Sequence, residues 1–343
     1  MEALPLVCLG IIFLAFAFDY INGFHDTANA IATVVSTRVL SPKAAIIMAS
    51  CLNFVGALLG THVASTIGKG IISMEAVNNS QMVIFSALVG AIVWNLLTWW
   101  LGLPSSSSHA LFGGMMGSAV AYGLFYGVNA GKILLIESIL QKIILPIFAS
   151  PIMGFAAGFI LMLGLSWALF LLKTHPVKIK NIFGKLQIVS SALMALSHGT
   201  NDAQKSMGII TMALFAGGLI GTMEVPLWVK IGCALVMAAG TASGGWRIIK
   251  TMGHKIFKLE TIHGFAAETS AAIVIFIASH FGAPISTTQV ISSSILGVGS
   301  TKRLSAVKWG IAGNIAIAWI VTIPISAFIG MIVFFVFHWF GWV

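Results

Sequence analysis

The chain has 343 residues, of which 58% are hydrophobic and only 8% are charged, and its mean hydropathy is +1.02. A soluble domain carries roughly 25% charged residues, so this composition excludes a soluble globular protein and predicts an integral membrane protein. The net charge of +9 comes from basic residues in short loops, which is a topology signal of membrane proteins rather than a nucleic-acid-binding surface. The 36 glycines and the lack of alternating polar strands predict an all-α bundle, not a barrel.

Apolar segments follow one another along the chain. The first comes after Met1-Glu2, which carries no basic residue, so we expect a retained span rather than a cleaved signal. The expected helices cover 4–35, 44–60, 83–101, 110–126, 145–172, 187–217, 228–246, 264–281, 289–299 and 308–340. Segments of about 30 residues exceed the roughly 20 that a bilayer needs. We therefore expect broken helices, with the break of the first at Asn22-Gly23.

Two motifs occur twice, in the same order and at nearly the same offset. Asp26, in Gly-Phe-His-Asp-Thr-Ala-Asn-Ala, precedes Asp202, in Gly-Thr-Asn-Asp-Ala-Gln-Lys-Ser, by 176 residues. The turn beginning Gly-Leu-Pro104 has its counterpart in Gly-Ala-Pro284, 180 residues later, and both lead into a helical pair. This pattern indicates a duplication, with a first repeat at 1–172, a basic linker at 173–186 and a second repeat at 187–343.

Loop charges predict that the two repeats have opposite orientations. The loop after the first Asp motif carries Arg38 and Lys43, whereas its counterpart in the second half carries Glu224 before Lys230. The reversed pattern is typical of the inverted repeats of secondary transporters. Four lysines between 173 and 185 place the linker on the cytoplasmic side of the cell membrane.

Both repeated motifs contain candidate ligands. A carboxylate at membrane depth costs at least about 2.5–3.5 kcal/mol, so Asp26 and Asp202 need either a partner or a function. They could cap the broken helices, or bind a cation such as Na⁺ or a divalent ion. A proline followed by hydroxyl residues indicates a helix start, where hydroxyls and free N–H groups can bind an anion or can simply cap the helix. These hydroxyl residues are Ser105, Ser106, Ser107, Ser108, Ser286, Thr287 and Thr288.

The expected charges do not balance. Four helix N-termini would supply roughly two positive charges, and Lys205 supplies another. Two ionised aspartates and a doubly charged oxyanion would supply four negative charges. We therefore expect a cation or a proton to bind together with the anion.

At these motifs the chain resembles the inorganic phosphate transporter (Pit) family, over essentially its whole length. The resemblance implies secondary transport of phosphate by alternating access, and a homodimer. His25-Asp26 and Gln204-Lys205 resemble the bacterial low-affinity branch, whereas sodium-coupled members usually have Asn-Asp in the first copy and Asn at the place of Lys205. That branch is associated with proton-coupled uptake of phosphate, often as a complex with Mg²⁺ or another divalent metal. The long hydrophilic central insertion common in that branch is absent here.

Further roles follow from the resemblance and from the residue chemistry. We expect Lys205 to replace one coupling sodium and Asp26 with His25 to handle a proton, although His25 could instead only form a hydrogen bond in the core. Glu268 is expected to pair with a basic group or to relay a proton, and Asp19 to support the helix break or to pair with a lysine. The remaining candidates are the asparagines next to the aspartates and the residues at the hairpin tips: Asn22, Asn29, Asn201, His109 and Gln289.

Other functions fit the sequence less well. The alternatives are a Na⁺-coupled phosphate symporter, a sulfate carrier and an anion channel with the same lining. An enzyme is not expected, because Ser107 or Ser108 cannot easily use the adjacent His109 as a base and no Gly-x-Ser-x-Gly motif is present. An ATP-driven pump is not expected either, because the phosphate-binding loop motif is missing. The three cysteines are expected to be packing residues, with no covalent cofactor.

Overall fold

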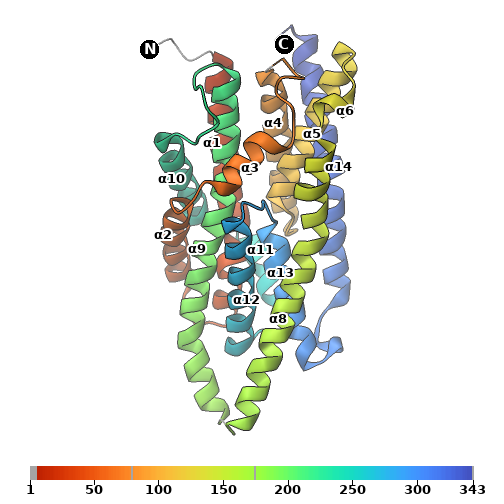
Figure 1. Ribbon diagram of the computed structural model, residues 1–343. Coiled ribbons are helices and arrows are strands. Elements are labelled where there is room, and N and C mark those ends of the chain that lie inside the picture. The colour runs from red at the N-terminus through yellow and green to blue at the C-terminus, as the bar shows by residue number, and fades with distance from the viewer. Residues whose placement is uncertain (1–5, 79, 174, 342–343) are drawn as a thin grey trace.

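The computed structural model describes residues 6–78, 80–173 and 175–341, and almost all of them are helical (Figure 1). Within these ranges, β-type pairing is limited to an isolated bridge between Ile72 and Leu134. Five of the described helices are long and apolar enough to cross a membrane, or seven spans when each of two bent helix pairs is included. The predicted all-α membrane fold is thereby confirmed. The prediction about Met1-Glu2 lies outside the described residues.

Each half of the chain contains a long helix, a bent helix pair, a hairpin of two helices and a final long helix. The first half consists of α1 (Leu6–Ser36), α2 (Pro42–Ala57), α3 (His62–Gly70), α4 (Gln81–Leu101), α5 (Ser107–Tyr126), α6 (Ala130–Ile133), α7 (Ile136–Ile139), η1 (Leu140–Ile144) and α8 (Leu145–Leu171). The second half consists of α9 (Pro176–Ala216), α10 (Leu227–Ser243), α11 (Trp246–Lys250), η2 (Thr251–Lys255), α12 (Thr261–His280), α13 (Thr287–Lys302), η3 (Leu304–Ala306) and α14 (Trp309–Trp339).

The long helices and hairpins of the two halves run in opposite directions. Figure 1 shows α1 descending from the end that holds both termini, while α9 ascends from the opposite end. The α4–α5 hairpin enters from the upper end and the α12–α13 hairpin from the lower end, so that their tips approach each other near the middle. An inverted repeat requires this arrangement. The duplication itself, and its boundaries, stay predictions.

The predicted breaks at the Asp motifs are wrong, because α1 continues through Asn22-Gly23 and α9 continues through Gly199. These glycines instead allow α1 and α9 to pack closely against neighbouring helices. A Cβ atom on Gly23 would lie 2.5 Å from the Met237 carbonyl oxygen of α10, and one on Gly199 would lie 2.4 Å from the Asn53 carbonyl oxygen of α2. The sharp bends occur elsewhere, between α2 and α3 (67°) and between α10 and the α11–η2 segment (59°).

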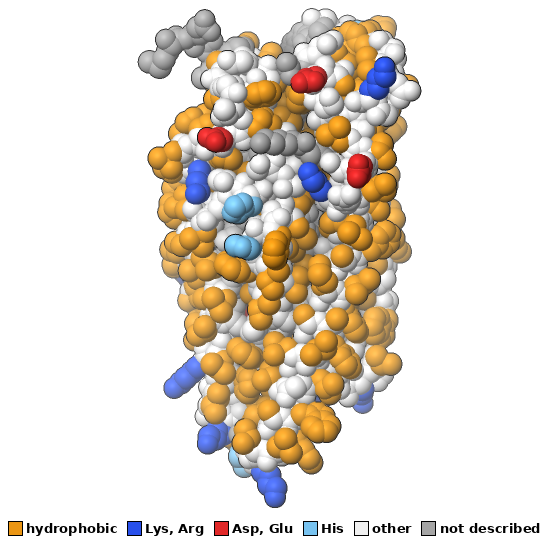
Figure 2. All heavy atoms as spheres, in the orientation of Figure 1, with side chains coloured by type: hydrophobic (Ala, Val, Ile, Leu, Met, Phe, Trp, Pro, Cys, Tyr) orange, Lys and Arg blue, Asp and Glu red, His pale blue; other side chains and the backbone are white. Residues whose placement is uncertain are grey.

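The basic linker expected at 173–186 is also mostly helical. α9 begins at Pro176, with His175 as its N-cap, so most of the lysines of the expected linker lie in this helix rather than in a loop. The chain turns between α8 and α9 at the lower end of the molecule (Figure 1). On the face shown in Figure 2, basic but no acidic side chains lie at this lower end, and the acidic ones gather near the upper end.

The Pro-Ser/Thr turns start helices, as predicted from their sequences. Gly102 and Gly282 end the preceding helices with φ of 67° and 70°, a left-handed conformation that glycine adopts without steric cost. Ser106 and Ser286 then cap the next helices, because their hydroxyls accept hydrogen bonds from the backbone of His109 and Gln289. α5 packs between α4 and α14, and α13 packs against α8 and α12. This packing fixes two helix N-termini beside the middles of α1 and α9.

Candidate functional site

Asp26 lies on α1, 2% exposed, and three side chains from three elements contact its carboxylate. The Nδ1 atom of His25 lies 2.7 Å from Oδ1. Ser107, in the first turn of α5, donates to Oδ2 at 3.0 Å, and Thr288, in the first turn of α13, donates to Oδ1 at 3.3 Å. The N-termini of both hairpin helices therefore meet at one carboxylate, where their partial positive charges stabilise an anion.

Asp202 lies on α9 and is fully buried. The ammonium of Lys205, one turn further along the same helix, donates to Oδ1 at 2.5 Å. Thr287 donates to Oδ2 at 3.0 Å, and Nε2 of His198 lies 3.1 Å from the same oxygen. This aspartate therefore has a fixed cation within the protein, which Asp26 lacks.

The two aspartates belong to one site. The amide of Asn29 on α1 donates to the hydroxyls of Thr287 and Thr288, at 3.2 and 3.0 Å, and these threonines contact Asp202 and Asp26 respectively. One ligand atom each of Asp26, His198 and Asp202 lies within 4.8 Å of the other two. Carboxylate and imidazole groups in this arrangement could hold a cation, and the helix N-termini and hydroxyls beside them could hold an anion.

The remaining predicted hydroxyls divide into two groups. Ser105 donates to Thr98 at 2.8 Å and lies 3.4 Å from Nε2 of His25, so it orients the histidine. Ser108 donates to the Ile285 carbonyl oxygen at 3.3 Å and joins the two hairpin tips. Ser106 and Ser286 are occupied as helix caps, which is the plainer of the two expected roles. Ser107, Thr287 and Thr288 are the hydroxyls that face the aspartates.

The secondary candidates occupy different places. Asn201 donates to Ser279 and to the Ala283 carbonyl oxygen, at 3.0 and 3.2 Å, and so fixes α9 to the second hairpin. The side chains of Asn22, His109 and Gln289 are buried, and polar atoms in each lack a hydrogen-bond partner among the described residues.

Glu268 lies on α12 and is fully buried, but among the residues that the structure describes it does not pair with a basic group, which was one of the two expectations. Its oxygens accept hydrogen bonds from Thr33 of α1, and from Ser190 and Gln187 of α9. These are neutral donors from two helices. The sequence does not reveal which helix faces pack together, so it could not show that these neutral donors surround Glu268.

Sequence reasoning missed His198. This histidine lies one turn before Asp202 on α9, and its Nδ1 atom lies 3.1 Å from the side-chain oxygen of Asn53 on α2. The available signal was its position four residues before a motif aspartate in an apolar segment, a spacing that places two side chains on one helix face.

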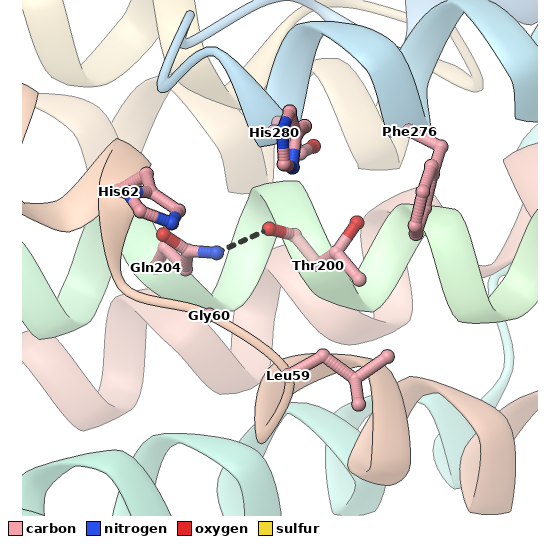
Figure 3. Close-up of a pocket in the computed structure, with 8 residues that line it drawn as sticks. Leu59, Gly60, His62, Thr200, Gln204, Phe276 and His280 are labelled. Atoms are coloured by element: carbon pink, nitrogen blue, oxygen red, sulfur yellow. Dashed lines mark hydrogen bonds between the residues drawn. The ribbon is translucent and has the colours of Figure 1, made fainter.

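A separate cavity of about 280 Å³ lies along α9 (Figure 3). Thr200 and Gln204 of α9 line it together with residues of the α2–α3 bend and the end of α12. Figure 3 shows the Gln204 amide directed at the Thr200 carbonyl oxygen, 2.6 Å away, while its other end accepts from the Val63 backbone at 2.8 Å. Gln204 thereby caps α3, and neither Asp26 nor Asp202 lines this cavity.

A buried site of two carboxylates, a lysine, hydroxyls and two helix N-termini, at the centre of an apolar helical bundle, defines a membrane transport protein. Comparison with known proteins identifies the kind. Residues 22–330 match the phosphate transporter family, and the chain belongs to that family.

Relatives match the chain over nearly its full length. It is 47% identical to a probable low-affinity inorganic phosphate transporter of Bacillus subtilis (strain 168), over 98% of each chain. It is 48% identical to a protein of the same description from Rhizobium meliloti (strain 1021), over 97% of each chain. A solved structure described as the sodium-dependent phosphate transporter matches with a TM-score of 0.86 at 25% identity, covering 97% of this chain and 99% of that one. The predicted family is confirmed, and its members are transporters rather than enzymes.

Proposed function

We propose that this chain carries inorganic phosphate across the cell membrane by alternating access, together with a cation. Support comes from the meeting of two helix N-termini and three hydroxyls at a buried pair of aspartates, in a chain of the phosphate transporter family. Ser107, Thr287 and Thr288 would exchange their present hydrogen bonds to the carboxylates for bonds to phosphate oxygens. Lys205 would contribute a positive charge to the same anion.

The charge balance supports cation coupling more strongly than the sequence suggested. Because α1 and α9 are unbroken, only the N-termini of α5 and α13 remain of the four helix N-termini that were expected. Two helix ends supply roughly one positive charge, and Lys205 supplies a second. Two aspartates and a divalent phosphate then leave about two negative charges uncompensated in a buried site. Phosphate binding therefore requires further positive charge.

Our choice of coupling ion rests on the 2.5 Å contact between the Lys205 ammonium and the Asp202 carboxylate. This ammonium occupies the position beside Asp202 that a sodium ion would otherwise occupy, and it cannot leave with the substrate. We propose protons as the coupling ion. Sodium coupling is the alternative, since the solved structure similar to this chain is described as sodium-dependent.

A metal-phosphate complex is a second candidate substrate. Asp26, His198 and Asp202 place one oxygen or nitrogen ligand each within 4.8 Å of the other two, which suits a divalent ion that has kept some of its water. Such an ion would supply the missing positive charge and would move with phosphate, so that fewer protons would be needed.

Phosphate uptake into proteoliposomes under separate proton, sodium and magnesium gradients tests this proposal. We expect accumulation with an inward proton gradient, without any requirement for sodium. Lys205→Asn should then create a requirement for sodium, because the fixed ammonium is gone. Strict sodium dependence of the unmodified protein would refute proton coupling, and phosphate conductance without accumulation would identify a channel. Competition by sulfate would identify a less selective carrier.

The orientation and the assembly are also proposals. We propose that the lower end in Figure 1, where α8 meets α9, faces the cytoplasm, because the exposed lysines there (Figure 2) follow the positive-inside rule. A homodimer follows from the family resemblance. Cross-linking in native membranes tests it.

A further inference from the structure

A polar stripe runs along α1 and extends beyond the site described above. Its members recur at intervals of three and four residues, which places them on one face of a helix, and each is at most 2% exposed. They are Asp19, Asn22, Asp26, Asn29 and Thr33. At about 1.5 Å per residue, Asp19 and Thr33 lie roughly 10 Å on either side of Asp26. The carboxylates found at the two ends of the stripe differ in the hydrogen bonds that they accept.

At the lower end, Thr33 donates to Glu268, and this carboxylate receives further hydrogen bonds from Ser190 and Gln187. At the upper end, both carboxylate oxygens of Asp19 are buried without a hydrogen-bond partner among the described residues. The same is true of both amide atoms of Asn22 and of the hydroxyl of Ser206 on α9, which is a neighbour of Asp19. Asp19 is thus an acid without a cationic partner among the described residues, in an incompletely hydrogen-bonded polar cluster where the Ser206 hydroxyl is the neighbouring donor.

The charged groups around Asp19 do not neutralise it. Lys205 lies near enough to interact electrostatically, but its ammonium is bonded to Asp202, which itself repels a charge on Asp19. α10 contributes Cys233, a buried neutral thiol, and the partly exposed Lys230. α4 contains no titratable residue, and Lys43 and Cys51 of α2, like Arg247 and Lys250 of α11, are exposed. The other titratable groups around the site are His25 and Asp26 on α1 itself, His109 on α5, His198 on α9, and Glu268 at the far end of the stripe.

An ionised carboxylate without a partner at this depth is far more costly than the satisfied carboxylates of Asp26 and Asp202. A proton removes this cost and needs no ligand shell. A sodium ion would have to bind next to the Lys205 ammonium, which repels it. We propose that Asp19 is the acid that binds the transported proton, and that it is neutral in the conformation described here.

This inference rests on the proposed function and names the residue that performs the coupling. A proton from water on one side forms an O–H bond with an Asp19 oxygen, and that bond breaks when the proton leaves to the other side. The protonated acid can donate to the hydroxyl oxygen of Ser206. When Asp19 is neutral, the upper part of the site carries one negative charge fewer, so phosphate binds at Lys205 with less repulsion.

Two assays on proteoliposomes separate the roles. Accumulation of labelled phosphate under a pH gradient requires the carrier to release its proton and return, whereas phosphate counterflow exchange at equal pH requires only the loaded carrier to reorient. Asp19→Asn mimics the neutral acid permanently. We expect exchange within about twofold of the unmodified protein and a loss of accumulation of at least tenfold. Asp19→Glu should restore accumulation in part, and Cys233→Ser, at a buried neighbour, should retain both activities.

Three results would overturn the inference. Asp19→Asn could accumulate phosphate under a pH gradient as well as the unmodified protein. It could lose exchange as well as accumulation while the purified protein stays monodisperse, which would indicate a packing or anion-binding role. The unmodified protein could prove to accumulate phosphate under a sodium gradient, and Asp19→Asn could lose this accumulation. Asp19 would then be a sodium ligand. If the unmodified protein exchanges no phosphate at all, the proposed function itself fails.

Discussion

The buried pair of Asp202 and Lys205 predicts an unequal response to the loss of each partner. Asp202 also contacts His198 at 3.1 Å and Thr287 at 3.0 Å, whereas the hydrogen bond described for the Lys205 ammonium is the one to Asp202. Breaking a buried pair by removing one partner costs about 3–5 kcal/mol. We expect Asp202→Asn to reach the upper part of this range. Lys205→Met should fall in the lower part, because Asp202 keeps its contacts with His198 and Thr287.

The double variant Asp202→Asn/Lys205→Met removes both charges and should recover most of the loss, since the coupling between contacting residues is not additive. Thermal unfolding in detergent measures the effect. At about 2 °C per kcal/mol, the single variants should lower Tm by roughly 6–10 °C and the double variant by much less. Lys132→Met, at an exposed position on α6, is the matched control and should change Tm little. A double variant as unstable as the two losses added together, or an Asp202→Asn milder than Lys205→Met, would refute the reasoning.

Three further variants test packing, phosphate binding and the lower polar cluster. Gly117→Ala should destabilise the protein by about 1–3 kcal/mol or more, because its Cβ would lie 1.9 Å from the Ala327 carbonyl oxygen of α14; Gly164→Ala, with open space around it, is the thermal-unfolding control. Ser107→Ala should raise the KM for phosphate about tenfold in uptake assays, since a hydrogen bond to a charged group contributes about 1.5–3 kcal/mol. Ser118→Ala, which removes only a bond within α5, should leave KM unchanged. Glu268→Ala should lower Tm more than Glu268→Gln, because alanine leaves the hydroxyls of Thr33 and Ser190 and the Gln187 amide without an acceptor.

The hairpins could be predicted from the sequence because their signals are local. A left-handed glycine, a proline and a capping serine lie within five residues of one another, and each has the same meaning wherever the rest of the chain goes. The close approach of Asp26 and Asp202 could also be predicted, because two motifs that recur in the same order indicate equivalent places in two halves. For the same reason, the hydroxyl-rich turns could be expected to face the aspartates.

Features that depend on distant partners could not be predicted. Gly23 was expected to break α1, but its role is to admit Gly240 of α10, which is a property of the pair and not of either segment. Ser106 caps α5, whereas Ser107 contacts Asp26. Which of these adjacent serines has which role depends on the residue at which the helix begins, and the periodicity of the sequence does not fix that residue. His198 and the neutral partners of Glu268 likewise become visible only when the helix faces are placed together.

The structure also shows why the two halves of the site should not work alike, and this leads to a last prediction. Three residues after Asp202 the chain has Lys205, while three residues after Asp26 it has Asn29, whose amide donates to Thr287 and Thr288. Under the proposed function, the α9 side therefore carries its own cation, Lys205. The α1 side has no fixed cation of this kind, so we expect a mobile cation to neutralise it.

Asn29→Lys would place an ammonium beside Asp26 at the same spacing, where it could still donate to the two threonines. A fixed charge on both sides removes the need for the mobile cation, so we expect phosphate exchange to continue while accumulation stops responding to any ion gradient. The matched variant Lys205→Asn makes the opposite change and should increase the dependence on a cation. Counterflow and gradient-driven uptake, measured side by side in proteoliposomes, distinguish these outcomes. If Asn29→Lys accumulates phosphate with the ion dependence of the unmodified protein, coupling does not take place at the α1 side of the site.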